Sequence, residues 1–240
     1  MTSYRIVFMG ATGAVGSAAF RTLLQRNEVA KILTLGRRAV DLPAPTERVE
    51  QQRIDVHDPT SYADYIDDYN VAVCTLGVGE PSAVPKADFI ALDKTAVLNF
   101  ARACKERGVR DFHLLSSVGA DAKSMNYYLR TKGELNDALE ALGFERLSIY
   151  RPSMILTPTN RYGFTQGIAL WLWPKLDAVL RGKWRKYRGI PVAHLGAAIA
   201  NNVFVDRRGV AYLEYDAFVE LVEKPTDRTD TGTPDISGQR

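Results

Sequence analysis

Residue types that together can move a proton lie close to one another between positions 116 and 132. Tyr128 and Lys132 are four residues apart, so on a helix their side chains share one face, whereas Tyr127 points elsewhere. A phenol can give or take a proton, and a neighbouring ammonium group favours its ionised form. Ser117, or in its place Ser116, precedes Tyr128 by eleven or twelve residues and could orient a carbonyl oxygen. We predict Ser117, Tyr128 and Lys132 as catalytic residues; the alternative is a half-exposed helix with a lysine lying along it.

This chemistry requires a scaffold that brings a strand end and a helix start to one edge. Up to Pro152, short apolar runs alternate with longer periodic segments, which is typical of a parallel sheet flanked by helices. We expect strands at 5–9, 31–36, 48–54, 70–77, 111–117 and 146–152, and helices near 14–26, 59–68, 87–107 and 127–142. Gly108 should end the helix at 87–107. The predicted fold class is α/β, a Rossmann-type doubly wound parallel sheet that binds ligands at the carboxyl ends of its strands.

The sequence GATGAVG follows the first expected strand directly and opens the first expected helix. Gly10, Gly13 and Gly16 supply a tight turn and let a pyrophosphate approach the backbone, while the helix N-terminus favours negative charge. The alternative is a glycine-rich turn that binds nothing, but the placement between strand and helix favours a dinucleotide site. The residues predicted to contact the phosphates are Gly10, Thr12, Gly13, Ala14, Val15 and Gly16.

The residues at the end of the second expected strand indicate which dinucleotide binds. Sites that prefer NAD usually carry a carboxylate there for the adenosine ribose, but this chain has Arg37 and Arg38. A guanidinium pairs well with a 2′-phosphate. We therefore predict NADP(H) as the cofactor, held by these two arginines; the alternative is a solvated surface pair.

Two further strand ends should face the cofactor, because the carboxyl ends of parallel strands share one edge. Asp55 and Val56 close the third expected strand, where the adenine ring would lie. Leu76, Gly77 and Val78 close the fourth, where a small residue lets the backbone come close. We predict that all five contact the cofactor.

The alternation of apolar runs is lost after Pro152. We expect one domain over residues 1–222, divided into a core at 4–152 and a small C-terminal substrate lobe at 153–222. The polar stretch 223–240 is predicted to be a flexible tail. Within the lobe, the tryptophan-rich and basic stretch 167–188 should pack on the core with its basic end exposed; the alternative is contact with an anionic membrane surface.

Composition excludes several classes of function. With 46% hydrophobic and 25% charged residues in 240, and a net charge of +3, the chain is an ordinary globular protein with no case for nucleic-acid binding. Cys74 and Cys104 form no CxxC pair, and His57 and His194 lack ligand spacing, so no metal site is predicted. The absence of a leader pattern and of a long apolar stretch predicts a cytoplasmic protein. For the oligomeric state, the alternatives are a monomer and a homodimer.

GATGAVG, the strand end LLSS and the motif YLRTK together resemble the short-chain dehydrogenase/reductase superfamily. Within it the chain is most similar to the atypical Tat-interacting-protein-like branch, on TLGRR, LLSSVGAD and YLRTKGE, with a late segment that holds Pro191, Val192 and Asn201-Asn202-Val203. The resemblance covers roughly residues 4 to 205.

The resemblance implies Tyr128 as acid/base, Lys132 as anchor of the nicotinamide ribose and Ser117 as hydrogen-bond donor to the substrate. It also implies that the stretch Arg151 to Met154, with Pro152 and Met154 as cofactor contacts, lines the nicotinamide face. Many members carry an asparagine where this chain has Asp93, so the usual proton relay is in doubt. The implied function is NADPH-dependent hydride transfer to or from a small carbonyl or alcohol substrate. The alternative is a non-catalytic NADPH-binding redox sensor or regulatory protein.

Overall fold

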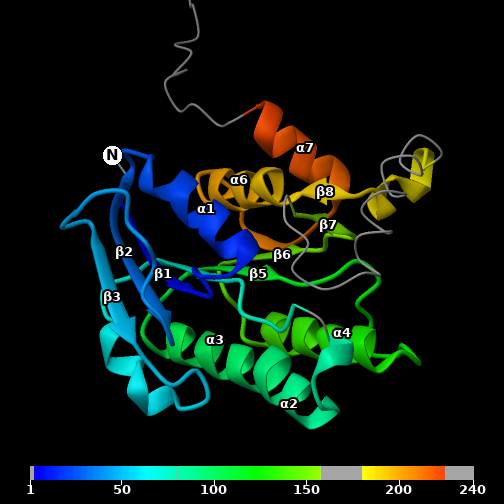
Figure 1. The fold of residues 1–240 in the computed structure, drawn as a ribbon, viewed down its shortest axis with the longest axis horizontal. Helices are drawn as coiled ribbons and strands as arrows, with labels where there is room; N and C mark the ends of the chain where they lie inside the picture. The colour runs from blue at the N-terminus through cyan, green and yellow to red at the C-terminus, as the bar shows by residue number, and fades with distance from the viewer. Residues whose placement is uncertain (1–2, 80, 158–179, 225–240) are drawn as a thin grey trace, which may run out of the picture.

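A parallel β-sheet forms the centre of the molecule, as the computed structural model of the protein shows (Figure 1). The structure describes residues 3–79, 81–157 and 180–224. The strand order is β3-β2-β1-β4-β5-β6-β9, and every neighbouring pair is parallel. The strands are β1 (Tyr4–Met9), β2 (Val29–Gly36), β3 (Val49–Arg53), β4 (Val71–Cys74), β5 (Asp111–Leu115), β6 (Arg146–Tyr150) and β9 (Gly209–Leu213). The order reverses between β1 and β4, and such a switch point leaves a crevice for a ligand at the carboxyl ends of the strands.

Helices cover both faces of the sheet, which confirms the predicted doubly wound α/β fold (Figure 1). One layer contains α1 (Ala14–Leu24), α6 (Val192–Asn202) and α7 (Tyr215–Glu223); the other contains α2 (Lys86–Ile90), α3 (Val97–Glu106) and α4 (Tyr127–Ala141). The alternation of side chains along β1 serves both layers. Ile6 and Phe8 are buried under the α1–α6 layer, and Val7 and Met9 under the α3–α4 layer.

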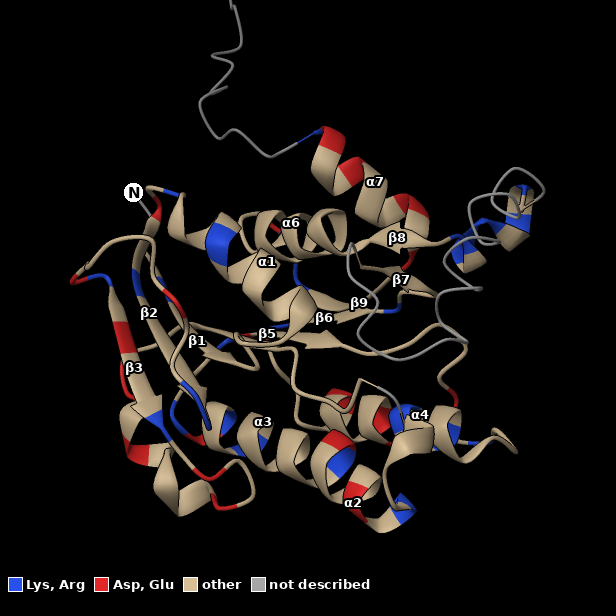
Figure 2. Cartoon of the chain, in the orientation of Figure 1, with Lys and Arg blue, Asp and Glu red and all other residues tan. Residues whose placement is uncertain are grey.

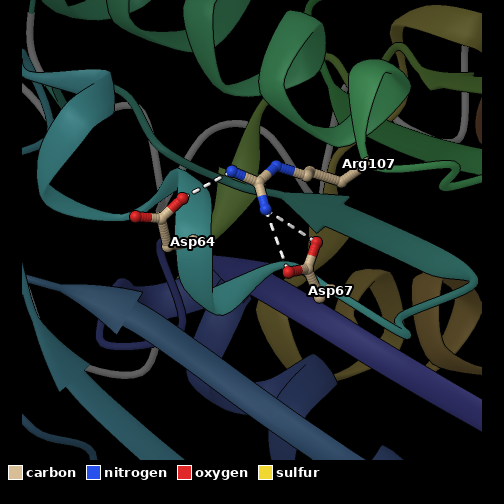
Figure 3. Close-up of polar contacts among 3 residues, drawn as sticks. All are labelled: Asp64, Asp67 and Arg107. Atoms are coloured by element: carbon tan, nitrogen blue, oxygen red, sulfur yellow. Dashed lines mark hydrogen bonds and ion pairs between the residues drawn. The ribbon is translucent and has the colours of Figure 1, made fainter.

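The segment predicted as a helix at 59–68 contains two separate 3₁₀ turns, Pro59–Ser61 and Ala63–Tyr65. That prediction was wrong because Tyr62, with φ −142°, leaves the helical region between the two turns. Arg107, at the end of α3, donates hydrogen bonds to the carboxylates of Asp64 and Asp67 and so fastens this segment to the α3–α4 layer (Figure 3).

The helix predicted at 87–107 is interrupted in its middle. Between α2 and α3, residues Ala91–Ala96 form a π-helical turn, a feature often found at functional sites. The end of α3 matches the prediction, because Gly108 has φ +80°. Its amide bonds to the carbonyl of Lys105, and the amide of Val109 bonds to that of Cys104, which is a Schellman motif.

Much of the range predicted as a substrate lobe belongs to the main layers. Strand β9 pairs with β6 as a seventh strand, although only six were expected, and α6 packs against α1. The close contact needs a small residue, because a Cβ on Gly196 would lie 2.5 Å from the Cβ of Ala18. Strand β9 was not predicted, because Val210 and Tyr212 are exposed at the sheet edge. The strand therefore lacks the apolar pattern typical of a buried strand.

A buried polar network explains why the late Asn201-Asn202-Val203 segment is part of the core. Arg146 of β6, 2% exposed, donates to the carbonyls of Asn202, Val203 and Val205 and so satisfies the end of α6. The Asn202 side-chain amide donates to the Tyr150 hydroxyl at 2.7 Å. These bonds hold α6 in register with the sheet.

The other described residues of the predicted lobe, 153–157 and 180–191, include a small separate strand pair. Strands β7 (Ile155–Leu156) and β8 (Ile190–Pro191) form a small parallel pair. A 3₁₀ segment at Gly182–Tyr187 lies just before β8 in the chain. Basic residues gather on that segment (Figure 2), and Arg185 pairs with Asp216 of α7 at 2.6 Å. Trp184 is 55% exposed. Residues 158–179, which include the first part of the tryptophan-rich stretch, lie outside the described residues, as does 225–240 of the predicted tail; Glu223 itself ends α7.

Replacing Gly133 of α4 by alanine should lower the free energy of unfolding. Alanine favours a helix over glycine by roughly 1 kcal/mol. Here, however, a Cβ would lie 2.1 Å from the backbone nitrogen of Ala122, and overpacking typically costs about 1–3 kcal/mol. Urea unfolding should show a net loss for Gly133→Ala, and Asp137→Ala, on the exposed side of α4, should stay within about 0.5 kcal/mol of wild type. A more stable Gly133→Ala would contradict this packing.

Candidate active site

The start of α4 places the two adjacent tyrosines in different surroundings. The Asn126 side chain caps the helix by accepting hydrogen bonds from the amides of Tyr128 and Leu129, at 2.9 and 3.3 Å. Tyr127 packs edge-on against Phe89 and donates its hydroxyl hydrogen bond to the Pro81 carbonyl at 3.2 Å. Tyr128 instead lines a cavity, as the four-residue spacing to Lys132 predicts.

The cavity, about 480 Å³ in volume, lies at the carboxyl ends of the central strands. It brings together the glycine turn, the ends of β4 and β5, the start of α4 and the stretch after β6, which are distant in the sequence. Its lining residues are Gly13, Ala14, Val15, Gly16, Thr75, Leu76, Gly77, Val78, Gly79, Asp93, Leu115, Ser116, Ser117, Val118, Tyr128, Lys132, Ser153, Met154, Ile155 and Thr157.

Lys132 forms a buried ion pair at the base of this cavity. Its Nζ lies 2.7 Å from Oδ1 of Asp93, and the two side chains are 6% and 2% exposed. Burial by itself would lower the pKa of Lys132, but the Asp93 carboxylate more than offsets this and, with a smaller contribution from Tyr128, raises the pKa above its usual value. An ammonium has three N–H donors, so a bound ligand can accept from those that Asp93 does not use.

Asp93, at the position where the resemblance leads us to expect an asparagine, contacts two other elements of the site. It lies on the π-helical turn, and its second oxygen accepts a hydrogen bond from the Val78 amide at 2.8 Å. The carboxylate therefore links Lys132 of α4 directly to the loop after β4. A Cβ on Gly77 would lie 2.8 Å from Asp93 Oδ1, which explains the glycine there.

The two serines at the end of β5 differ in their bonding. Ser116 is 6% exposed and donates its hydroxyl to Oδ1 of Asn136 at 3.0 Å. Ser117 makes only a long contact, 3.4 Å, to the carbonyl of Val118. Both line the cavity, but Ser117 has the hydroxyl that is more available to a ligand. Asn136 was not predicted as a site residue, although it stands four residues after Lys132 on the same face of α4.

The glycine turn packs so tightly against β4 that larger residues do not fit. Gly10 has φ +93°, and a Cβ there would lie 2.6 Å from the Leu76 amide nitrogen. A Cβ on Gly16 would lie 2.1 Å from the carbonyl oxygen of Gly10, which also accepts hydrogen bonds from Gly13 and Thr75. The first residues of α1 therefore line the cavity with backbone, as a bound pyrophosphate requires.

A second cavity of about 60 Å³ shares Leu76 with the lining of the first. Its other lining residues are Gly10, Ala11, Thr12, Thr34, Leu35, Gly36, Arg37, Arg38, Val40 and Val56. Arg37 and Arg38 are exposed, and within the described part of the chain neither forms an ion pair with a carboxylate. Asp55, also predicted here, lines neither cavity; its carboxylate accepts a hydrogen bond from the His57 amide at 2.9 Å.

Only part of the stretch after β6 faces the main cavity. Ser153 and Met154 line it. Pro152 lies behind, where its carbonyl accepts a hydrogen bond from the Val118 amide at 2.9 Å, and Arg151 pairs with Glu214 at 3.5 Å. The prediction that all four residues line the site was therefore wrong for Arg151 and Pro152, because their polar groups hold β5, β6 and α7 together instead.

Neither a metal site nor a membrane span is found within residues 3–79, 81–157 and 180–224. These ranges contain no cluster of three or more histidine, cysteine or acidic side chains arranged to hold a metal ion. No helix among them is long and apolar enough to cross a membrane.

The sequence matches the model of the NAD(P)H-binding family over residues 10–167, and the chain belongs to this family. It is 30% identical to Protein HTATIP2 of Rattus norvegicus over 223 residues, covering 92% of this chain and 90% of that protein. It is also 34% identical to Protein FMP52, mitochondrial, of Meyerozyma guilliermondii over 158 residues, covering 63% of this chain and 65% of that one. These relatives confirm the resemblance to the atypical NAD(P)-binding branch of the short-chain dehydrogenase/reductase superfamily.

Solved structures of low sequence identity share the fold. MoeE5 in complex with UDP-glucuronic acid and NAD superposes with a TM-score of 0.66 at 19% identity, covering 87% of this chain and 75% of that one. The Bordetella bronchiseptica enzyme WbmH in complex with NAD+ gives a TM-score of 0.64 at 16% identity, covering 92% and 79%. At this level of identity the likeness establishes a Rossmann-type architecture.

Replacing each serine separately should distinguish their roles without any ligand. Ser116→Ala removes the hydrogen-bond donor to Asn136, which is 2% exposed, and leaving a buried polar group unpaired costs about 1–3 kcal/mol. Ser117→Ala should change the free energy of unfolding by less than about 0.5 kcal/mol. Equal losses for the two variants in urea unfolding would show that Ser117 also has a structural role.

Proposed function

We propose that the protein is an NADPH-dependent oxidoreductase that transfers hydride to or from a carbonyl or alcohol substrate. The observation that carries this proposal is the single cavity in which Tyr128 and Lys132 face the tightly packed glycine turn. Membership of the NAD(P)H-binding family supports the use of a nicotinamide dinucleotide. When bound, the cofactor supplies the hydride, and the protein supplies orientation and the proton.

Three residues that line the cavity have separate roles in the reaction. In the direction of reduction, the Ser117 hydroxyl donates a hydrogen bond to the substrate carbonyl oxygen, and the Tyr128 hydroxyl gives that oxygen its proton. Lys132 binds the nicotinamide ribose through the N–H groups that Asp93 leaves available. Oxidation of an alcohol uses the same groups in reverse, with the Tyr128 oxygen taking the proton.

We assign the preference for NADPH over NADH to Arg37 and Arg38. They line the second cavity next to the glycine turn, and neither has a carboxylate partner among the described residues. A 2′-phosphate carries negative charge that a guanidinium can bind with two parallel hydrogen bonds. Of the predicted adenine contacts, Val56 lines this cavity and the adjacent Asp55 does not.

The rival function, a non-catalytic NADPH-binding sensor, has less support from the site. A protein that only binds the nucleotide has no need of a phenol beside a buried ammonium, yet Tyr128 and Lys132 both line the cavity. The small-molecule substrate, the monomeric or dimeric state and the cytoplasmic location remain predictions.

Tyr128→Phe tests the catalytic assignment. The phenol proton is needed in the transition state, whereas cofactor binding depends on the glycine turn and the arginines, so the two effects should separate. With an aldehyde or ketone that the wild type reduces, kcat should fall at least roughly a hundredfold while the Kd for NADPH changes little. Tyr127→Phe is the matched control and should keep wild-type turnover, because Tyr127 lies outside the cavity. Unchanged turnover in Tyr128→Phe would refute the assignment.

Arg37→Ala tests the choice of cofactor. A charge-assisted hydrogen bond contributes about 1.5–3 kcal/mol, so one or two should favour NADPH over NADH by roughly ten- to a thousandfold in the wild type. The substitution should weaken NADPH and leave NADH almost unchanged, and titration calorimetry with both nucleotides measures this directly. Arg38→Ala is the companion variant, since its stem could cover the adenine face instead. Equal affinities in the wild type would overturn the NADP assignment.

A further inference from the structure

The carboxylate of Asp93 distinguishes this site from one built around an asparagine. An asparagine side chain would leave the charge of Lys132 uncompensated, whereas Asp93 sets an anion 2.7 Å from the ammonium in a place from which water is nearly excluded. At this separation and burial, the two charges nearly cancel in their effect on neighbouring groups.

Among the described residues, the charged group closest to Lys132 is Asp93, whose carboxylate lies 2.7 Å from the ammonium. Tyr128 lies on the same helix as Lys132 and lines the same cavity. The Cys74 thiol of β4 is near enough to interact electrostatically with Lys132 and Asp93. Burial raises the pKa of this thiol to about 12, so the thiol stays neutral. Lys94, next to Asp93, pairs with Glu134 of α4 at 2.6 Å on a partly exposed surface, where solvent screens both charges.

We propose that Asp93 is a positioning residue that keeps the Tyr128–Lys132 pair fully protonated through neutral pH, so that the site favours carbonyl reduction. The proposal rests on the proposed function, because it concerns the same proton. The geometry supports it, because an anion fixed beside the pair stabilises the protonated form of the pair as a whole. This holds whichever of the two groups carries the proton. The raised pKa of Lys132 agrees with this.

Removing the charge of Asp93 should lower the pH at which the Tyr128–Lys132 pair loses its first proton. Reduction needs a phenol that still carries its proton and an ammonium that still holds the ribose, so loss of the first proton from either group of the pair slows it. If the negative charge of Asp93 is removed, the pair carries an uncompensated positive charge and releases its first proton at lower pH. An opposite charge within about 4–6 Å shifts a titration by roughly 1–3 pH units.

The test is a titration of the full chain without cofactor or substrate. Carbon-13 placed at lysine Cε and tyrosine Cζ reports each group by NMR, and Tyr128→Phe and Lys132→Arg identify the two signals. In Asp93→Asn, at least one of the two signals should titrate about one pH unit or more below its wild-type midpoint. Asp88→Asn, which removes an exposed carboxylate from the same helical segment, should leave both midpoints unchanged. Asp93→Glu, which keeps the charge, should retain the wild-type midpoints.

Two results would overturn the proposal. One is a folded Asp93→Asn protein in which both signals titrate as in the wild type. The other needs no variant and holds even if Asp93→Asn fails to fold: a wild-type Lys132 that loses its proton before ordinary lysines do. Because neither substrate nor cofactor is present, these outcomes are independent of whether the protein proves to be an oxidoreductase. With an active protein, the alkaline fall in kcat/KM for reduction should move to lower pH by the same shift in Asp93→Asn.

Discussion

A buried ammonium group keeps its charge at a high free-energy cost unless an anion lies beside it, and this constraint links the parts of the site. Removing a lone charge from water costs several kcal/mol, and Asp93 offsets that cost for Lys132 at the base of the cavity. Asp93 in turn occupies its position because the π-helical turn between α2 and α3 presents it and the Val78 amide holds its second oxygen. Three elements, α4, the π turn and the loop after β4, are therefore positioned by one ion pair.

The rest of the fold supplies a rigid frame around that pair. Close backbone contact at Gly10 and Gly16 leaves the start of α1 open to a ligand instead of filled by side chains. On the same side of the sheet, Arg146 and Asn202 hold α6 in place through buried hydrogen bonds, and α6 supports α1 from behind. Tyr128 and Lys132 are thus carried by a helix, which holds geometry better than a loop does, and Ser117 follows the end of β5 by two residues.

The features that could be predicted from the sequence depend on residues close together in the chain. The glycine turn depends on residues within one strand–helix junction, and the Tyr128–Lys132 pair depends on a spacing of four within one helix, so both follow from short-range geometry. The seven-stranded fold was recognisable from its first six strands. Strand β9 was missed because its exposed side chains at the sheet edge show no buried pattern, and α6 because only its packing on α1 reveals its place. The position of Asp93 in a helix before β5 could be predicted. Its contact with Lys132 could not, because the two residues lie on helices that are distant in the sequence. Ser116 and Ser117 were interchangeable until Asn136 was placed beside one of them.

A crystal structure of the protein grown with NADPH tests the central claim most directly, because the claim is that two adjoining cavities form one dinucleotide site ending at Tyr128. The account predicts density that runs from Arg37 and Arg38, across the glycine turn, to a nicotinamide ribose within hydrogen-bonding distance of Lys132 Nζ. A nucleotide bound elsewhere on the molecule, or one whose nicotinamide end lies away from Tyr128 and Lys132, would contradict it.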